Sequence, residues 1–483
     1  MKISNPKIFL STVALAVSAC VAPTHAYAFD FKSGDLYYNI LTTHDAAVEV
    51  TRDVDNAYEF TSVTIPSSVD YDGKTYTVVG IGNNAFRNCV GLVSVNMESE
   101  LTYFDKNAFY NCRKLQAIAI PDGISEITPY CFYNCESLGE VTIPESVKKI
   151  GSYAFIGCAS LTDIEIPDNV TEIGAFAFQS CSGLESVSLG NSVTTIGEEG
   201  FAVCEKLTQI NLPSTLTSIG EYAFFDDPAL LRLSIPASVS KIGMGAFGYC
   251  SRLSTIEVNE SNPSFTSQNG VLYSKDQTEL VCCPAAKSEI QIPSTVSSIN
   301  AGAFWGCELI SVIDLPSTVS FIGQKAFDYC ISLKSIVIPE GVTTLDEMVF
   351  YQCENMESVV IPTSVTFVAW NAFGQCTALK SIFCNGTVPP ECTYEKIFEA
   401  STFSDATLYV PQDALEEYKN AYIWSDFEKI EPQKDSSVDE IYATYAEQET
   451  EYFTIDGRRT HNPEKGQFLI KRQGNKVSKV VIR

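Results

Sequence analysis

Apolar residues recur along this chain with a fixed period of 23 residues. The clearest marker is a phenylalanine, usually preceded by alanine, at Phe86, Phe109, Phe132, Phe155, Phe178, Phe201, Phe224 and Phe247 and, after one longer gap, at Phe304, Phe327, Phe350 and Phe373. A short fixed period is the signature of a solenoid, in which each repeat forms one coil and buries its apolar face against its neighbours. The pattern therefore predicts a repeat solenoid over most of the chain.

The repeat unit can be written I-G-x-x-A-F-x-x-C-x-x-L-x-x-I-x-I-P-x-x-V-x-x, as in residues 150–172. Its L-x-x-I-x-I segment predicts a short strand with alternating inward residues, which the proline ends because it lacks a ladder donor. V-x-x-I-G predicts a second, shorter strand, and A-F-x-x-C suits one helical turn with Phe and Cys both inward. The predicted fold is mainly β: short strands plus one helical turn per coil.

Cysteine is frequent, with 17 residues, and most copies follow the repeat. Eleven stand three residues after the phenylalanine, and only Asp227 breaks the column: Cys89, Cys112, Cys135, Cys158, Cys181, Cys204, Cys250, Cys307, Cys330, Cys353 and Cys376. Equivalent side chains in a stack point the same way rather than at each other. We therefore favour a buried column of thiols over disulfides. No C-x-x-C pair occurs, and we predict no metal and no cofactor.

This unit resembles that of the BspA-like leucine-rich repeat family of bacterial surface proteins over about residues 81–387. Departures are few: Gly200 and Val349 replace the alanine, Cys131 does so before Phe132, and Asp227-Pro228 replaces the cysteine region. The resemblance implies surface display and binding of host or partner macromolecules. It does not identify the partner.

The N-terminal 28 residues have the features of a signal peptide: an early basic residue, an apolar run and a small-x-small cleavage pattern at residues 26–28. A lipobox-like V-S-A-C sequence makes Cys20 an alternative candidate for lipidation. The run is too short to span a membrane. Residues 29–80 lack the repeat but alternate strongly, with strands expected at 35–41, 47–50 and 75–79 and a turn at Asp72-Gly73. We expect this region to cap the first coil.

The longer gap holds an insertion at about residues 259–288. Asn269-Gly270 between extended runs is a strong hairpin signal, and Tyr273 follows on the second strand. An insertion that projects from a solenoid is a candidate binding feature, represented by Asn269, Gly270 and Tyr273. The alternative is a neutral decoration of the array.

The repeat decays after Phe373. We expect a C-terminal cap at 388–431, with a last strand at 406–411, a helix at 413–421 and aromatic cover from Trp424 and Phe427. Residues 432–450 are acidic and aperiodic, as in a linker. Residues 451–483 predict three strands and resemble, in their D-G-R-R, K-G-x-x-x-I and K-V-V-I-R elements, the C-terminal sorting domain of type IX secretion cargo in Bacteroidetes. That resemblance implies an outer-membrane-surface or secreted location.

Charge and composition argue against several classes of partner and against an enzymatic function. The formal net charge is −27, which disfavours nucleic acid and anionic membranes as partners. There are 3 histidines, and none belongs to a recognisable catalytic triad, phosphate loop or zinc motif. We predict that the protein is not an enzyme.

The candidate partner-binding face is the outward side of the L-x-x-I-x-I strands: Glu140, Thr142, Asp163, Glu165, Glu185, Gln209 and Asn211. Its carboxylates suit a cation or a basic patch on a partner, although a plain solvated face has the same composition. The leading hypothesis is an adhesin-type binding protein whose partner is a host extracellular matrix or other surface protein. The alternatives are a carbohydrate-binding or carbohydrate-active solenoid and a self-assembling surface-layer scaffold.

Overall fold

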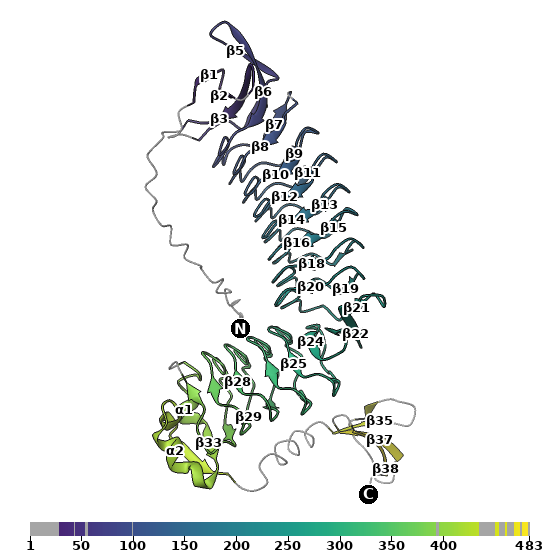
Figure 1. Cartoon of the computed structure of the whole chain (residues 1–483), viewed down its shortest axis with the longest axis vertical. Coiled ribbons are helices and arrows are strands. Elements are labelled where there is room, and N and C mark those ends of the chain that lie inside the picture. The colour runs from purple at the N-terminus through teal and green to yellow at the C-terminus, as the bar shows by residue number, and fades with distance from the viewer. Residues whose placement is uncertain are drawn as a thin grey trace.

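The computed structural model describes residues 29–433, apart from 43, 54–56, 99 and 393–395, and the backbone of four strands between residues 450 and 481. The predicted signal segment with Cys20 and most of the predicted linker lie outside the described residues. Figure 1 shows a long array of stacked coils between two caps. This confirms the predicted β-solenoid fold.

A twisted sheet covers the first coils, as expected for residues 29–80. Its strand order is β1-β2-β3-β6-β5, with β8 also paired to β6. Asp72 and Gly73 form the turn between β5 and β6, both with positive φ. The strands are β1 (Phe31–Ser33), β2 (Leu36–Ile40), β3 (Ala47–Thr51), β5 (Ser68–Tyr71), β6 (Lys74–Ile81) and β8 (Tyr103–Phe104).

Two parallel ladders run through the N-terminal part of the array, as the repeat unit predicts. The first ladder comes from L-x-x-I-x-I and contains β4 (Ser62–Ile65), β7 (Ser94–Met97), β9 (Ala117–Ala119), β11 (Glu140–Thr142), β13 (Asp163–Glu165), β15 (Ser186–Ser188), β17 (Gln209–Ile210), β19 (Arg232–Ile235) and β21 (Thr255–Val258). The second comes from V-x-x-I and contains β10 (Glu126–Ile127), β12 (Lys149–Ile150), β14 (Glu172–Ile173), β16 (Thr195–Ile196), β18 (Ser218–Ile219) and β20 (Lys241–Ile242). In both, paired residues stand one repeat apart, except that β4 and β7 pair across 32 residues, as Ser62 does with Ser94.

The segment expected to form one helical turn instead forms consecutive hydrogen-bonded turns. In every repeat, the residues two before and two after the phenylalanine have positive φ, as Tyr153 and Gly157 do around Phe155. The flipped peptides let alternate N–H groups reach the next coil: Phe155 N donates to Ala177 O at 2.8 Å and Tyr153 N to Ala175 O at 2.9 Å. A helix would direct these donors along its own axis. Phe and Cys nevertheless both point inward, as predicted.

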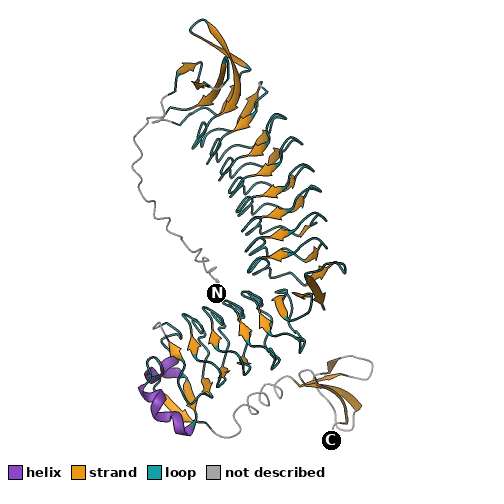
Figure 2. Cartoon of the chain, viewed as in Figure 1, coloured by secondary structure: helices purple, strands orange, loops and turns teal. Residues whose placement is uncertain are grey.

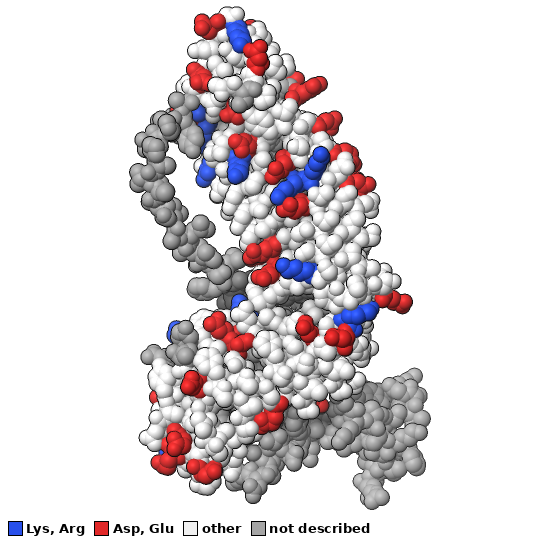
Figure 3. All heavy atoms as spheres, in the orientation of Figure 1, with Lys and Arg blue, Asp and Glu red and all other residues white. Residues whose placement is uncertain are grey.

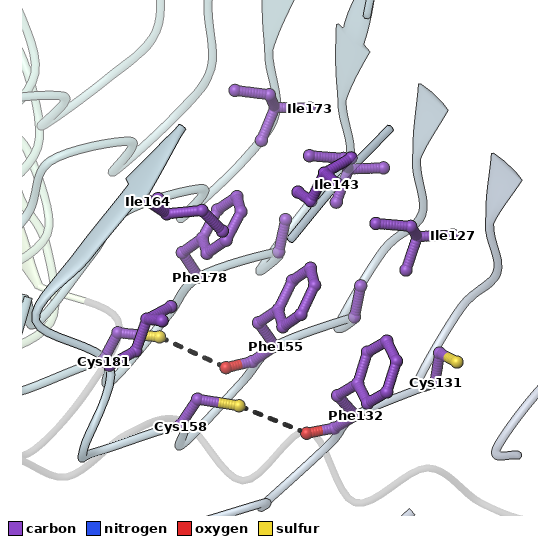
Figure 4. Close-up of a cluster of buried hydrophobic side chains, with 14 of the residues drawn as sticks. Ile127, Cys131, Phe132, Ile143, Phe155, Cys158, Ile164, Ile173, Phe178 and Cys181 are labelled. Carbon is purple, nitrogen blue, oxygen red and sulfur yellow. Dashed lines mark hydrogen bonds between the residues drawn. The ribbon is translucent and has the colours of Figure 1, made fainter. Parts of the chain in front are cut away.

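The repeat phenylalanines form a continuous ring stack inside the N-terminal coils. Phe178 is fully buried, with ring centroids 5.1 Å from both Phe155 and Phe201. Nine of the eleven column cysteines donate their S–H to the carbonyl of the phenylalanine one coil earlier, as Cys158 does to Phe132 at 3.3 Å (Figure 4). The described cysteines are all free thiols, which confirms the predicted column.

The glycine of V-x-x-I-G permits close stacking. A Cβ on Gly174 would lie 2.6 Å from Ser152 N and 2.8 Å from Gly151 C, which are backbone atoms of the preceding coil. Any larger residue there would have to push two coils apart.

The insertion is a meander of β22 (Phe265–Gln268), β23 (Val271–Ser274) and β24 (Glu279–Cys282). The hairpin predicted at Asn269-Gly270 is present, with φ of 52° and 79° at the two turn residues. The last strand does not project: β24 pairs in parallel with β25 (Ser298–Ile299), which pairs with β26 (Phe321–Ile322). The meander is therefore built into the stack, and the array changes direction near it (Figure 1).

The C-terminal coils rebuild both ladders. One contains β27 (Ser335–Val337), β29 (Ser358–Ile361), β31 (Ser381–Cys384), β33 (Thr407–Val410) and β34 (Lys429–Pro432). The other contains β28 (Thr344–Leu345), β30 (Phe367–Val368) and β32 (Glu391–Cys392). Helices among the described residues gather in the C-terminal cap (Figure 2): α1 (Thr402–Asp405), η1 (Gln412–Ala414), α2 (Leu415–Asn420) and η2 (Trp424–Asp426). The predicted strand and helix are present, but β34 follows them as a further strand.

The C-terminal region forms a separate antiparallel sheet of order β36-β35-β37-β38. Its strands are β35 (Thr450–Phe453), β36 (Arg459–Thr460), β37 (Phe468–Gln473) and β38 (Lys476–Val481). The three predicted strands thus become four, because the first is divided in two.

Candidate functional site

The predicted strand-face residues are exposed on neighbouring strands. Glu140 and Thr142 lie on β11, Asp163 and Glu165 on β13, and Gln209 on β17, with Asn211 just after it. Asp163 pairs with Ser186, and Ser186 with Gln209, so these three positions form one row along the array. We call the outward side of β11, β13, β15 and β17 the strand face.

Glu185 falls outside that row. It precedes β15 by one residue, and Lys206 lies 3.9 Å from its carboxylate. The expected cluster of Glu140, Asp163, Glu165 and Glu185 is therefore incomplete, because a shift of one residue along a strand points a side chain elsewhere. On the side of the molecule drawn in Figure 3, Asp and Glu side chains are scattered over the array rather than gathered in one patch. Among the described residues, no group of three His, Cys, Asp or Glu side chains is arranged to hold a metal ion.

The strand face changes beyond the insertion. Val337 is half-buried there, and Val360, Ser335 and Ser358 are buried, whereas Thr142 and Glu165 at matching positions are exposed. The accessible polar row is thus a property of the N-terminal coils.

The repeat with this geometry matches a known family. A family model described as BspA type leucine rich repeat region covers residues 55–185, 171–269 and 281–404. The chain belongs to the BspA-type leucine-rich repeat family. The match begins before residue 81, where Val63-x-Ile65-Pro66 already carries the strand-and-proline half of the unit and β4 pairs with β7.

Solved structures agree with this assignment. A leucine rich cell surface protein from Faecalibacterium prausnitzii A2-165 is 30% identical and has a TM-score of 0.57, with 73% of this chain and 94% of that chain covered. A leucine-rich repeat protein from Bacteroides ovatus is 27% identical, with a TM-score of 0.51 and coverage of 84% and 100%. The pneumococcal vaccine antigen PcpA shares the fold at 19% identity and a TM-score of 0.55, with coverage of 85% and 100%. A search of curated proteins finds no significant match.

The insertion of this BspA-type protein offers less surface than expected. Tyr273, named as part of the candidate binding insertion, is only 1% exposed and belongs to the hydrophobic core, so its side chain is not on the surface. Asn269 is exposed at the hairpin tip, and Gly270 beside it packs against Thr255 of β21. Alternation predicted the hairpin, but it could not show which side packs on the array.

A second surface was missed by the sequence argument. We call it the turn face: the side chains two residues before, one after and two after each repeat phenylalanine. Aromatic rings there stack from coil to coil, with centroids 4.5 Å apart for Tyr130–Tyr153, 4.7 Å for Tyr153–Phe176 and 4.6 Å for Tyr110–Tyr133. All of these rings are half-buried. The available signal was an aromatic recurring at the same repeat position, outside the core pattern.

A second group of turn-face rings lies where the array changes direction. Trp305 is its centre, with edge-to-face contacts to Phe225 at 5.0 Å, Tyr222 at 5.8 Å and Tyr249 at 6.0 Å. Glycines make the room: a Cβ on Gly245 would lie 3.0 Å from the Tyr222 ring and 3.2 Å from the Trp305 ring. Rings from the coils on either side thus meet over a coil that has no side chain there.

Two polar atoms near this group have no described partner. Trp305 is 8% and Asp328 5% exposed, and neither Trp305 Nε1 nor Asp328 Oδ1 has a hydrogen bond. Burial raises the pKa of Asp328 to about 8, so its carboxyl is largely protonated at neutral pH. The turn face therefore combines aromatic rings with unused hydrogen-bonding groups.

The groove at the C-terminal cap, the buried thiols and the helices give no further candidate for a functional site. A groove with a volume of about 610 Å³ lies at the C-terminal cap beside β30, where Glu391 is the one charged residue lining it. Burial raises the pKa of the column thiols Cys135 and Cys181 to about 12, which makes these two cysteines poor nucleophiles at neutral pH. None of the helices in the described part of the chain is long and apolar enough to cross a bilayer.

Proposed function

We propose that this protein is an adhesin-type binding protein, displayed on the cell surface or secreted, that engages a partner protein through an exposed face of its solenoid. The observation that carries the proposal is the regular array itself. Buried stacks of Phe and Cys fix the coils, and the outward positions then repeat at about 4.8 Å along an extended surface. Such a surface suits a macromolecule better than a small ligand.

Export is part of the proposal. The segment before Phe29 has signal-peptide features, and the last residues resemble a type IX sorting domain. The cell-surface description of the Faecalibacterium relative supports the same location. A host extracellular matrix or other surface protein is the proposed partner class.

No catalytic role is proposed. His44 is the one histidine among the described residues, and it lies in the N-terminal cap, away from the repeat columns. The acidic row on β11 and β13 lacks the neighbouring basic row expected for cleavage of acidic polysaccharides.

The test is a binding array. The full chain is presented to extracellular matrix proteins and polysaccharides at physiological salt, with binding followed by surface plasmon resonance. Saturable binding to a protein supports the proposal, and its loss in a Glu140→Gln, Asp163→Asn, Glu165→Gln variant assigns the strand face. Binding to polysaccharides alone would replace the protein partner by a glycan. No binding, together with association of the chain in light scattering, would favour a self-assembling scaffold.

A further inference from the structure

The turn face carries its own acidic segment, placed between the two aromatic groups. Successive coils contribute Phe176, Glu199 and Tyr222 at the same repeat position, two residues before the phenylalanine. The backbone ladder fixes this order: Phe176 N donates to Glu198 O at 2.7 Å, and Glu199 N to Glu221 O at 2.9 Å. A carboxylate thus stands between two rings along the array, with Glu198 and Glu221 immediately beside it.

These carboxylates repel one another. Partial burial and the neighbouring Glu198 raise the pKa of Glu199. Burial, followed by Glu221, Glu199 and Glu198, raises the pKa of Tyr222 to about 12. None of the three glutamates forms an ion pair with a described Lys or Arg. Glu199 accepts one hydrogen bond from Gln179 Nε2, which does not neutralise its charge.

Two rings of the same face already contact cationic side chains of this chain. Arg87 lies over the Tyr110 ring, 4.4 Å from its centroid, and Lys325 lies over the Trp305 ring at 4.6 Å. Cationic side chains can therefore pack on rings at this repeat position. Between these two places, the segment around Glu199 has rings and carboxylates but no such cation among the described residues.

We propose that the turn face binds an extended, cationic segment of a partner protein, with a Lys or Arg side chain seated at Glu199 between Phe176 and Tyr222. This inference rests on the proposed function and names the face and the partner chemistry. Carboxylates supply charge-assisted hydrogen bonds, and the rings supply cation–π attraction.

The wider composition of the turn face fits such a partner. Tyr, Trp, Phe and Met are enriched where protein interfaces bury their centres, whereas Asp, Glu and Ser are depleted. The strand face has the depleted set, whereas on the turn face Tyr153, Phe176 and Tyr222 occupy the same repeat position as Glu199.

The face is poorly suited to sugars. Saccharides stack on the open faces of rings, but Tyr130, Tyr153 and Phe176 cover one another's faces with interplanar angles of 3° and 6°. Inside this stack the rings present edges and tyrosine hydroxyl groups to solvent. The Phe176 face on the side of Glu199 has no described ring over it, and a cationic side chain of a peptide can lie beside it.

The probe is a short extended peptide of alternating Arg and Gly, with citrulline in place of Arg as the uncharged control. Binding to the full chain is measured by calorimetry at low and physiological salt. The triple variant Glu198→Gln, Glu199→Gln, Glu221→Gln is expected to lower the affinity for the Arg peptide by about tenfold or more. The double variant Phe176→Leu, Tyr222→Leu leaves the charge unchanged and is expected to lower that affinity by about threefold or more.

A matched control variant distinguishes the effect of the three carboxylates at the proposed site from the effect of the overall negative charge. Asp122→Asn with Glu126→Gln and Glu417→Gln removes three exposed charges elsewhere and is expected to change binding less than about twofold. Equal weakening by both triple variants, or no effect of the ring variant, overturns the inference. So does an Arg peptide that binds no better than the citrulline peptide. If instead the strand-face variant abolishes binding of a partner protein and the turn-face variants do not, the inference fails while the proposed function stands.

Discussion

The regular coils pack their side chains differently from the junction, by which we mean the insertion and the coils next to it on both sides. From Phe86 to Phe224, neighbouring rings stack at 5.1 to 5.7 Å within 8° of parallel, apart from 13° at Phe132–Phe155. Each coil is held by the coil before it, through identical contacts. At the junction this repetition stops, and the hydrophobic core divides into two clusters, one ending with Leu272 and Cys282 and the other starting with Val271 and Tyr273.

The junction replaces repetition with individual contacts. The meander extends the second ladder, Trp305 joins rings across two glycines, and buried aspartates stand where the regular coils have apolar or solvated residues. Asp227 takes the column position of a cysteine, and Asp328 lies one residue after Phe327. The coil-to-coil contacts therefore repeat only where each coil packs on an equivalent coil, and other contacts replace them where the insertion interrupts the array.

The largest expected effect lies in the regular coils. Phe178→Ala removes a ring buried between two others and is expected to lower the free energy of unfolding by about 3–5 kcal/mol. Urea denaturation of the full chain, followed by circular dichroism, measures it. Phe176→Ala in the same coil is the control and is expected to cost about 1 kcal/mol, because that ring is half-buried. A loss below about 1 kcal/mol for Phe178→Ala would contradict the stacked core.

At the junction, Trp305→Ala is expected to lower the free energy of unfolding by about 2–4 kcal/mol. Because fewer ring contacts then join the coils on the two sides of the insertion, thermal unfolding is expected to divide into two transitions. Differential scanning calorimetry records both results. Trp370→Ala, at a half-buried position in the C-terminal coils, is the control and should keep the wild-type number of transitions. An unchanged profile for Trp305→Ala would mean that the meander alone joins the two halves.

The junction also predicts an unusual pH dependence. The native carboxyl of Asp328 keeps its proton up to a pKa of about 8, whereas an unfolded aspartate releases it near pH 4. The native state thus binds more protons across this window, so stability falls as pH rises through it and levels off above it. Between about pH 5 and 8 the decrease is on the order of 4 kcal/mol. Asp328→Asn should make the profile less steep, with part of the slope left because burial also raises the pKa of Asp227. Asp122→Asn at an exposed site should leave the profile unchanged.

Asp227→Cys is expected to repair the cysteine column and stabilise the protein by about 1–2 kcal/mol. The present carboxyl is fully buried, accepts a bond from Cys204 N at 2.7 Å and leaves its second oxygen unpaired. A thiol there would donate to the Phe201 carbonyl, as most other column cysteines do in their coils. The unfolding midpoint in urea measures the gain. A loss of stability would show that Pro228 or its neighbours require the aspartate.

Much of the fold could be predicted from one periodic signal. Burial of Phe178, Cys181 and their equivalents follows from the spacing of apolar residues alone. The left-handed turn residues could not be predicted in the same way, because Tyr153, Phe176 and Glu199 are not residue types that favour positive φ. Their conformation is imposed by the neighbouring coil, which needs alternate N–H groups. Hydrophobic periodicity reports side-chain burial and carries no information on peptide orientation.

The candidate surfaces show the same limit. Exposure of Glu140, Asp163 and Glu165 follows from strand alternation. Glu185 lies outside the row because it stands 22 residues after Asp163, one short of the repeat period, and this offset can be read from the sequence. The turn face was overlooked because its rings are only half-buried and differ from coil to coil. Burial of Tyr273 depends on how the meander folds onto β21, which is a tertiary contact.

The smallest expected effect concerns an exposed side chain of the strand face in the regular coils. Glu165→Ala on β13 should change the free energy of unfolding by no more than about 0.5 kcal/mol, because the side chain is exposed and has no ion pair among the described residues. Ile164→Ala, its buried neighbour on the same strand, is the control and should cost about 2–5 kcal/mol. Chemical denaturation of both variants measures the two losses in the free energy of unfolding. A large loss for Glu165→Ala would mean that the strand face is covered within the folded chain, and a partner would then have to bind elsewhere.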